Sequence, residues 1–462
     1  MSDSIWYLGL LDVSDRIRRR ELSSLEVTRS LLDRIERLDP RLRSYQVVLA
    51  DSAMMRAAEA DREIAGGLWR GPLHGVPIAI KDILLTKGVP TLAGMPLRAG
   101  LPADEDATAV ARLRLAGAVL LGKLHMTEGA MMHHHPELPR PMNPWGTDHW
   151  PGVSSSGSGV AVAAGLCFGA LGSDTGGSIR MPSSANNVTG IKPTWGRVSR
   201  HGLVPLVESM DHLGPMARST ADAAAILQVI AGHDPDDTTT LPAPVPDYRA
   251  APGRLDDLVI GIDRNFVEDG IAPEIVATLR DAERLFGELG ARFRQVTMPK
   301  LPSYMAVMFS GIAAAHTDYY PAQADRYSPE FRKILEVAIS LDPAAVARAY
   351  QDCARYAGAM NRLLDEVDLL LLPGLGAPVP SWPEMETVLS IAVLRDHPLM
   401  RFTTPFNISG LPTISLPAGF GANGLPIGIQ LAGPKLSEPL LIRAGSAFQA
   451  VSDAHTRHPP LD

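Results

Sequence analysis

Two tracts of serine and glycine, each leading into a segment with helical character, constrain the fold of this chain more than any other feature. The first tract, G-V-S-S-S-G-S-G, covers residues 152–159, and the second, G-S-D-T-G-G-S, covers residues 172–178. Glycine adopts backbone conformations that other residues avoid, so such tracts favour tight turns. In these turns serine hydroxyls and backbone N–H groups can converge on one point. The tracts therefore predict a binding or catalytic site.

A lone lysine ends a short apolar run upstream of both tracts. Lys81 follows V-P-I-A-I at residues 76–80, and Asp82 comes directly after it. A serine hydroxyl becomes a good nucleophile when a base takes its proton, and a buried lysine can be that base if its pKa falls far below the usual value of about 10.4. The alternative is a structural lysine paired with a carboxylate such as Asp82. With the serine tracts, Lys81 provides the groups of a serine hydrolase that needs no histidine.

The second tract has a further property, because its successive backbone N–H groups can point at one spot. The N–H groups of Thr175, Gly176, Gly177 and Ser178 would form a nest for an anion or for the oxyanion of a tetrahedral intermediate. A phosphate-binding turn at a helix start is the alternative, although no Gly-Lys-Ser/Thr follows as in a P-loop. Serines at a helix start commonly act as caps, and we expect Ser158 to do so.

The remaining pattern alternates helices with short apolar strands. This alternation favours a largely parallel or mixed sheet covered by helices on both faces. The region of about residues 1–65 is predicted to be helical, with capping-box spacing from Ser23 to Glu26 and an end at Pro40. The region of about residues 303–365 is also predicted to be helical and is a candidate cap inserted over a pocket. The 462 residues, with 45% hydrophobic content, support a substantial core.

Composition and charge exclude several classes of protein. The net charge of −8 gives no electrostatic reason to expect a nucleic-acid partner. Cys167 and Cys353, the two cysteines, exclude a disulfide framework and fit a reducing compartment. The chain shows no basic-then-apolar signal segment, and its most apolar stretch, residues 160–171, is too short to span a bilayer. We expect a cytoplasmic protein with no membrane partner.

A run of three histidines at residues 133–135 invites a metal interpretation. Adjacent side chains rarely converge on one ion, and no carboxylate-rich motif accompanies them. We therefore expect no metal and no other cofactor. The histidines, with Met131, Met132 and Trp145, are instead predicted to border the mouth of a pocket.

The two tracts and their surroundings resemble the amidase signature family. The segments that carry the resemblance are P-G-V-S-S-S-G-S at 151–158, G-S-D-T-G-G-S-I-R at 172–180, G-I-K-P-T at 190–194, G-V-P-I-A-I-K-D at 75–82, G-A-V-L-L-G-K at 117–123, G-L-P at 410–412 and G-L-P-I-G-I-Q at 424–430. The resemblance therefore covers most of the chain. It implies a single α/β/α domain, residues 1–462, around a large mixed and mostly parallel sheet, with a Ser–cis-Ser–Lys triad.

Position by position, the resemblance assigns roles to named residues. Ser178 is the nucleophile, Ser154 the bridging serine and Lys81 the base, and the peptide bond Val153–Ser154 is cis. Residues 175–178 supply the oxyanion hole. Neutral Lys81 takes a proton through Ser154 while Ser178 attacks the carbonyl; Ser154 then protonates the departing nitrogen, and water clears the acyl-enzyme. Esters are expected to react as well, since their leaving groups are better.

Three positions depart from the family pattern. Val153 and Ser156 replace signature glycines, and Met400 stands where the A-type chains of glutamine-using amidotransferases carry an aspartate that recognises the substrate ammonium. The methionine favours a stand-alone hydrolase over an amidotransferase A-type subunit with a B-type partner. A noncatalytic phosphate or nucleotide binder, built on the same turns, is the alternative of another class.

The signature does not specify the substrate. Carboxamides, anilides and carbamates, including urethanes, all present a carbonyl bonded to nitrogen. Pocket shape decides among them, and we expect it to be set by loops around residues 125–150, 303–330 and 374–404. Met131, His133 and Met400 are the candidate substrate-binding residues. The apolar content of these loops favours a small aryl or alkyl amide or carbamate, and relatives of this kind are often homodimers.

Overall fold

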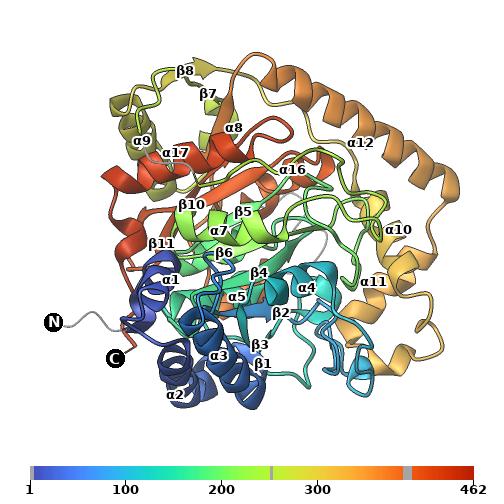
Figure 1. Ribbon diagram of the computed structural model, residues 1–462. Coiled ribbons are helices and arrows are strands. Elements are labelled where there is room, and N and C mark those ends of the chain that lie inside the picture. Colours follow the sequence, from blue (N-terminus) through green and yellow to red (C-terminus); the bar gives the residue numbers. More distant parts are fainter. Residues whose placement is uncertain (1–4, 250–252, 389–397, 462) are drawn as a thin grey trace.

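A computed structural model describes residues 5–249, 253–388 and 398–461 (Figure 1). Its centre is an eleven-stranded sheet in the order β1-β3-β2-β4-β6-β5-β10-β11-β9-β7-β8. The strands are β1 (Tyr45–Val48), β2 (Pro77–Lys81), β3 (Val119–Leu124), β4 (Gly169–Asp174), β5 (Thr189–Lys192), β6 (His212–Ala217), β7 (Val259–Ile262), β8 (Arg292–Gln295), β9 (Leu369–Pro373), β10 (Thr413–Phe420) and β11 (Pro426–Ala432).

Helices surround this sheet (Figure 1). They are α1 (Leu10–Arg18), α2 (Ser24–Leu42), α3 (Ala50–Ala65), α4 (Thr108–Leu115), α5 (Ser156–Ala163), α6 (Arg180–Asn186), α7 (Thr220–Ile230), α8 (Arg264–Glu268), α9 (Pro273–Glu288), α10 (Met305–Ala315), α11 (Pro329–Ile339), α12 (Pro343–Leu364), α13 (Trp382–Val388), α15 (Pro398–Arg401), α16 (Thr404–Ile408) and α17 (Glu438–Val451). No helix within the described ranges combines the length and apolar character needed to cross a membrane.

The sheet is mixed, as expected, but it is not mostly parallel. In the described part of the chain, four neighbouring strand pairs are parallel and six are antiparallel. Parallel neighbours need a crossover, usually a helix. Such crossovers serve β2, β3 and β4 and also β7, β8 and β9, whereas a short turn joins β10 directly to β11. The alternation of helices and strands predicted more parallel strand pairs than the sheet contains. It fails here because the relative direction of two strands depends on which strands become neighbours.

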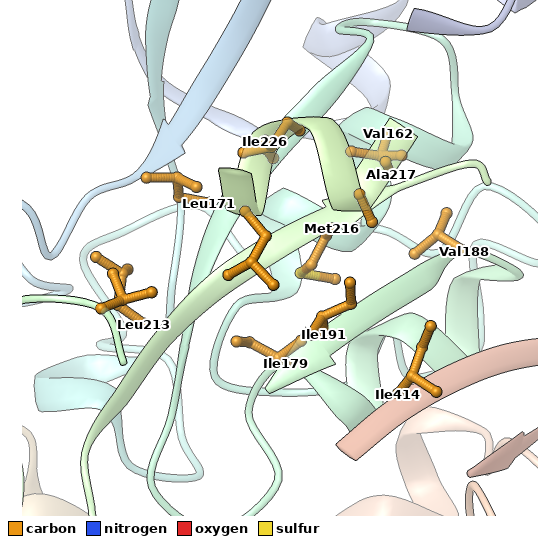
Figure 2. Close-up of a cluster of buried hydrophobic side chains, with 14 of the residues drawn as sticks. Val162, Leu171, Ile179, Val188, Ile191, Leu213, Met216, Ala217, Ile226 and Ile414 are labelled. Atoms are coloured by element: carbon orange, nitrogen blue, oxygen red, sulfur yellow. The ribbon is translucent and has the colours of Figure 1, made fainter. Parts of the chain in front are cut away.

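The middle of the sheet is buried on both faces. Every residue of β2, β4, β5 and β6 is buried, so none of these strands presents a face to solvent. Figure 2 shows side chains from β4, β5, β6 and β10 packing together with Ile226 of α7 and Val162 of α5. Because both faces of β2 are covered, its last residue, Lys81, is also buried.

The N-terminal helices confirm one predicted boundary and correct another. Ser23 caps α2, because its hydroxyl accepts a hydrogen bond from the N–H of Glu26 at 3.0 Å. Pro40 does not end this helix; α2 continues to Leu42 and stops at Arg43, which has a left-handed φ of 55°. A proline interrupts one hydrogen bond and clashes with the preceding turn. In α2 the cost falls on the last turn, which the helix tolerates. The predicted helical region 1–65 is interrupted by a strand, because Tyr45–Val48 form β1 and pair with β3. Residues 1–4 of this region lie outside the described residues.

The segment 303–365 forms α10, α11 and α12, which lie together along one side of the molecule (Figure 1). A buried contact ties them to the loop after β3. The carboxylate of Glu128 accepts hydrogen bonds from the N–H of Ser328, at 3.0 Å, and from its hydroxyl. The same hydroxyl caps α11 by accepting from the N–H of Phe331. This contact places α10 and α11 beside the ends of β2 and β4, where the candidate site lies.

Candidate active site

Lys81 lies at the end of β2, between β3 and β4, and is fully buried. Its Nζ is 2.7 Å from Ser154 Oγ and 2.8 Å from Ser173 Oγ. Burial lowers the pKa of Lys81 from its ordinary value to about 7, although the charges of Asp174 and Asp211 oppose the shift. The alternative of a structural pair with Asp82 is wrong, because the Asp82 carboxylate is 2.8 Å from Lys123 Nζ instead.

The first tract brings Ser154 to this lysine. The Val153–Ser154 peptide bond is cis, as the resemblance implied. Gly152, with a φ of 75°, allows the chain to pass close to α6; a Cβ atom at this position would lie 2.4 Å from the Cα of Pro182. Ser155 then bonds across to β4 and the second tract, since its N–H donates to the carbonyl of Ser178 at 3.3 Å. The two tracts therefore pack against each other.

Ser158 does not cap α5 as expected. The helix begins at Ser156, and the residue before it makes no side-chain cap. The Ser158 hydroxyl donates to the carbonyl of Leu171 at 2.9 Å, because α5 packs directly against β4. Ser155 and Ser158 thus serve the contact between the first tract and β4 rather than the helix end.

Ser178 lies in the turn between β4 and α6 and is 7% exposed, toward a cavity that it helps to line. Its hydroxyl makes no hydrogen bond to any described residue, and this includes Ser154. Catalytic hydrogen bonds are often long or poorly aligned before a substrate binds. The structure thus brings Lys81 and Ser154 into direct contact and leaves Ser178 facing the cavity.

Asp174 organises the turn that precedes Ser178. Its carboxylate accepts hydrogen bonds from the N–H groups of Gly177, at 2.8 Å, and Ile179, at 3.0 Å, and pairs with the buried Arg180 at 2.8 Å. Burial opposes ionisation here, but the charge and hydrogen bonds of Arg180 hold the pKa of Asp174 below its usual range. Because it is ionised, Asp174 can fix several backbone donors at once.

The predicted oxyanion donors therefore differ in their surroundings. The N–H of Gly177 is bonded to Asp174, whereas those of Thr175, Gly176 and Ser178 bond to no described residue. The orientation of the turn is set from the other side by Thr403, whose hydroxyl donates to the carbonyl of Gly176 at 2.6 Å. Gly177 has a φ of 130°, and a Cβ atom there would lie 2.7 Å from Thr403 Oγ1. The turn thus leaves three backbone N–H groups without a protein acceptor in the described chain.

The cavity beside Ser178 has a volume of about 410 Å³, within the range of about 300–1,000 Å³ usual for small-molecule sites. Methionine is the commonest residue type in its wall, and the charged side chains that reach it, on α11 and α13, are exposed. The predicted residues Met131, His133 and Met400 all line it. The methionines of the wall are Met131, Met132, Met181, Met305, Met308 and Met400.

Three other predicted rim residues do not line the cavity. His134 is half-buried, with Nε2 3.0 Å from Ser156 Oγ. His135 is buried away from the cavity wall, and Trp145 donates from Nε1 to the carbonyl of Asn186 at 3.0 Å. Of the loop predicted at 374–404, residues 389–397 lie outside the described residues. The sequence located the histidine-containing loop, but only packing determines which of its side chains reaches the cavity.

Sequence reasoning missed four residues that shape the site. Ser173 and Asp174 stand inside the second tract, which was a signal, but nothing local showed which way they point. Asp211 accepts a hydrogen bond from the Thr175 hydroxyl at 2.5 Å and another from the N–H of Leu206 at 2.9 Å. Asp211 and Thr403 come from segments far along the chain, so no local pattern identified them.

A single family model matches most of the chain. The family model described as Amidase matches residues 26–442. The AmiD protein of Mycobacterium tuberculosis, named "Putative amidase AmiD", is 46% identical over 465 residues, covering 99% of this chain and 97% of that protein. The A-type subunit of the glutamyl-tRNA(Gln) amidotransferase from Roseiflexus sp. is 38% identical over 490 residues, covering 98% of each.

Solved structures of a cyclic dimer hydrolase and of a peptide amidase are similar to this chain over nearly its whole length. A 6-aminohexanoate cyclic dimer hydrolase complexed with substrate is similar with a TM-score of 0.88 and 29% identity, covering 99% of each chain. The native peptide amidase of Stenotrophomonas maltophilia is similar with a TM-score of 0.84 and 32% identity, covering 98% of each chain. The likeness extends over the whole sheet and its helices.

Proposed function

Since this chain belongs to the amidase signature family and is thus an amidase acting on C–N bonds, we propose that it works through an acyl-enzyme formed on Ser178. The observation that carries this proposal is the 2.7 Å contact between Lys81 Nζ and Ser154 Oγ in a fully buried site, next to a serine that faces a cavity. Lysine is a base only when uncharged, and this burial favours the uncharged amine.

The first half of the reaction forms the acyl-enzyme. The amine of Lys81 accepts the proton of Ser154, and Ser154 accepts the proton of Ser178 as Ser178 Oγ bonds to the substrate carbonyl carbon. The carbonyl oxygen becomes an oxyanion. The N–H groups of Thr175, Gly176 and Ser178 are available to it, and one such donor is worth about 10²–10³ in rate. The bond to Gly177 supports the proposal indirectly, because it holds the turn in place.

The second half releases both products. Ser154 donates a proton to the departing nitrogen, which leaves as a neutral amine, and Lys81 returns its proton to Ser154. Water then attacks the ester on Ser178 and gives up a proton through Ser154 to Lys81. The same proton returns by way of Ser154 to Ser178 Oγ as the carboxylic acid or carbamic acid leaves. The enzyme ends in its starting protonation state. Esters of similar shape follow the same route.

We propose a small linear aryl or alkyl amide or carbamate as substrate. The methionine-rich wall supports an apolar group beside Ser178, since thioether side chains adapt to irregular apolar ligands. Met400 Cε lies close to Gly176, 3.3 Å from a Cβ atom built there. A methionine at this point gives no ionic partner to a substrate ammonium. The site therefore supports a stand-alone hydrolase better than a glutamine-using subunit.

A serine-reactive fluorophosphonate probe tests the proposal. We expect labelling at Ser178, found by mass spectrometry, and loss of labelling in Lys81→Ala. The control is Lys87→Ala, which removes an exposed lysine and is expected to label normally. A folded protein that does not label would instead favour a noncatalytic phosphate or nucleotide binder.

A substrate panel then addresses the chemical class. We expect turnover of apolar p-nitroanilides, carbamates and esters, and poor turnover of glutamine. Copurification with a B-type partner, together with glutaminase activity, would contradict the stand-alone assignment and favour the amidotransferase role.

A further inference from the structure

Lys81 has a second hydroxyl partner that the proposed relay does not use. Ser173 Oγ lies 2.8 Å from Lys81 Nζ, almost the same distance as Ser154 Oγ. Ser154 is fully buried and Ser173 is 2% exposed, so bulk water does not compete for the amine. The amine makes no other hydrogen bond in the described ranges. The hydrogen-bond partners of Lys81 Nζ are therefore two hydroxyl oxygens that come from different chain segments.

A neutral amine has two N–H groups and one lone pair, and this limits how it can use two hydroxyls. To act as base toward Ser154, the amine must direct its lone pair at the Ser154 O–H. An N–H then points at Ser173 Oγ, which has lone pairs to accept it. If the amine were free to rotate about its last bond, the lone pair would often face elsewhere. We propose that Ser173 is a positioning residue that accepts an N–H from Lys81 and thereby turns the amine's lone pair toward Ser154.

Ser173 is itself rigidly held, as this role requires. It lies in β4, between β2 and β6. The Ser155 hydroxyl spans its backbone, accepting from the Ser173 N–H at 3.3 Å and donating to the Ser173 carbonyl at 3.2 Å. Ser155 directly follows Ser154. One residue thus links the strand that carries Ser173 to the segment that carries Ser154, which keeps the two hydroxyls in register around the amine.

The charged groups that face Lys81 cannot provide this orientation. Asp174, at the end of β4, and Asp211, before β6, raise the pKa of Lys81 through their charges but make no hydrogen bond to it. Asp82, which follows Lys81 on its own strand, is paired with Lys123. Ser173 differs from all three because it contacts Nζ directly. A hydroxyl accepts a stronger hydrogen bond from an ammonium than from an amine, so loss of this hydroxyl lowers the pKa of Lys81.

The inference rests on the proposed lysine relay, and Ser173→Ala tests it. We expect kcat on a p-nitroanilide to fall by about 10- to 100-fold, part of the 10²–10⁴ usual for general acid–base catalysis. KM should stay within about twofold, since Ser173 does not line the cavity. We expect the parent to show an acid limb of kcat/KM near pH 7, set by the pKa of Lys81. In Ser173→Ala this limb should move to lower pH, because the amine would lose its proton more easily.

Ser158→Ala is the matched control. Its buried hydroxyl also bonds to β4, at the carbonyl of Leu171, but does not contact Lys81. We expect its pH profile to match the parent. If Ser173→Ala does not fold, Ser173→Cys takes its place. Its side chain is only slightly larger, but its sulfur is a weak acceptor, so the same shift is expected.

Unchanged kcat and an unmoved acid limb in a folded Ser173 variant would overturn the inference, as would an equal shift in Ser158→Ala. The proposed function fails differently. If Lys81→Ala or Ser178→Ala keeps full activity, the relay itself is wrong, whatever Ser173 does.

Discussion

The amine of Lys81 lies in the interior with the hydroxyls of Ser154 and Ser173 as its partners. Burial is the main reason that its pKa falls to about 7. A neutral base at moderate pH is what the proposed chemistry needs, and a fold that buries a lysine without a carboxylate partner loses stability to obtain it. At this scale, the same physical effect serves catalysis and destabilises the native state.

This effect gives a pH-dependent stability. In the unfolded chain Lys81 keeps its proton up to about pH 10.4, whereas in the folded chain it keeps it only below about pH 7. Between these values the unfolded state binds more protons, so stability of the parent rises with pH by up to about 1.4 kcal/mol per pH unit from this group. The variant Lys81→Met lacks this pH-dependent contribution to stability, because methionine does not titrate. Its free energy of unfolding should exceed that of the parent most at pH 7 and below.

Urea unfolding of both proteins from pH 6 to 10 measures this difference, because all other titrating groups are common to the two. We expect the stability advantage of Lys81→Met to shrink steadily as pH rises above 7. An advantage that stays constant with pH would mean that Lys81 keeps its ordinary protonation in the folded protein.

At the scale of elements, the site is made where a helix from late in the chain meets the turn between β4 and α6. Thr403, just before α16, fixes that turn through Gly176, and its own carbonyl accepts a hydrogen bond from Arg180 at 2.7 Å. Arg180 in turn pairs with Asp174. The start of α16 and the turn are therefore one hydrogen-bonded unit, and the orientation of the Gly176–Gly177 peptide depends on both.

Two neighbouring threonines allow a matched test of this unit. Thr403→Val removes the hydroxyl that holds Gly176, so we expect a loss of about 0.5–1.5 kcal/mol of stability, the net value of such a bond, and at least a tenfold fall in kcat. Thr404 is equally buried, but its hydroxyl has no partner among the described residues. Thr404→Val should therefore keep full activity with equal or higher stability. Thermal unfolding and kcat measure both effects; equal losses in the two variants would contradict the assignment.

At the scale of the whole molecule, the cavity exists only because distant segments meet. Its wall combines the loop after β3, the turn before α6, α10 and α11 from the segment 303–365, and α15. No single segment has the pattern of a binding site, and helical spacing of apolar residues in α10 is equally typical of plain core. The shared property of the wall, its methionines, becomes visible only in the assembled fold.

Met400 tests the apolar character of this cavity. Met400→Asp places a charge beside Gly176, and we expect kcat/KM for an apolar p-nitroanilide to fall by about 10- to 100-fold, since the buried contact of a methionine is worth about 1.5–3 kcal/mol. Met400→Leu keeps volume and polarity and should lose much less. Steady-state kinetics on both variants measures the effect. Equal activity of the aspartate variant on the apolar substrate would show that this part of the wall does not contact it.

The sequence alone determined the local chemistry of this protein. The tight turns, the cap at Ser23 and the order of helices and strands follow from residues close together in the chain, because backbone preference and periodicity are local properties. The resemblance to the amidase signature family supplied the roles expected of Lys81, Ser154 and Ser178. The predicted cap at Ser158 failed because its hydroxyl bonds to the carbonyl of Leu171, whereas the predicted helix end at Pro40 failed because the last turn of α2 tolerates a proline.

Only the tertiary structure decided which strands run antiparallel, that Asp82 pairs with Lys123, and that Ser173 lies against Lys81. It also brought Asp211 and Thr403 to the turn before Ser178. These features join residues far apart in the chain, and their free energy comes from burial and hydrogen bonding that exist only once the sheet has closed around them. A local pattern can place a lysine at the end of a strand, but its neighbours in space determine whether it carries a charge.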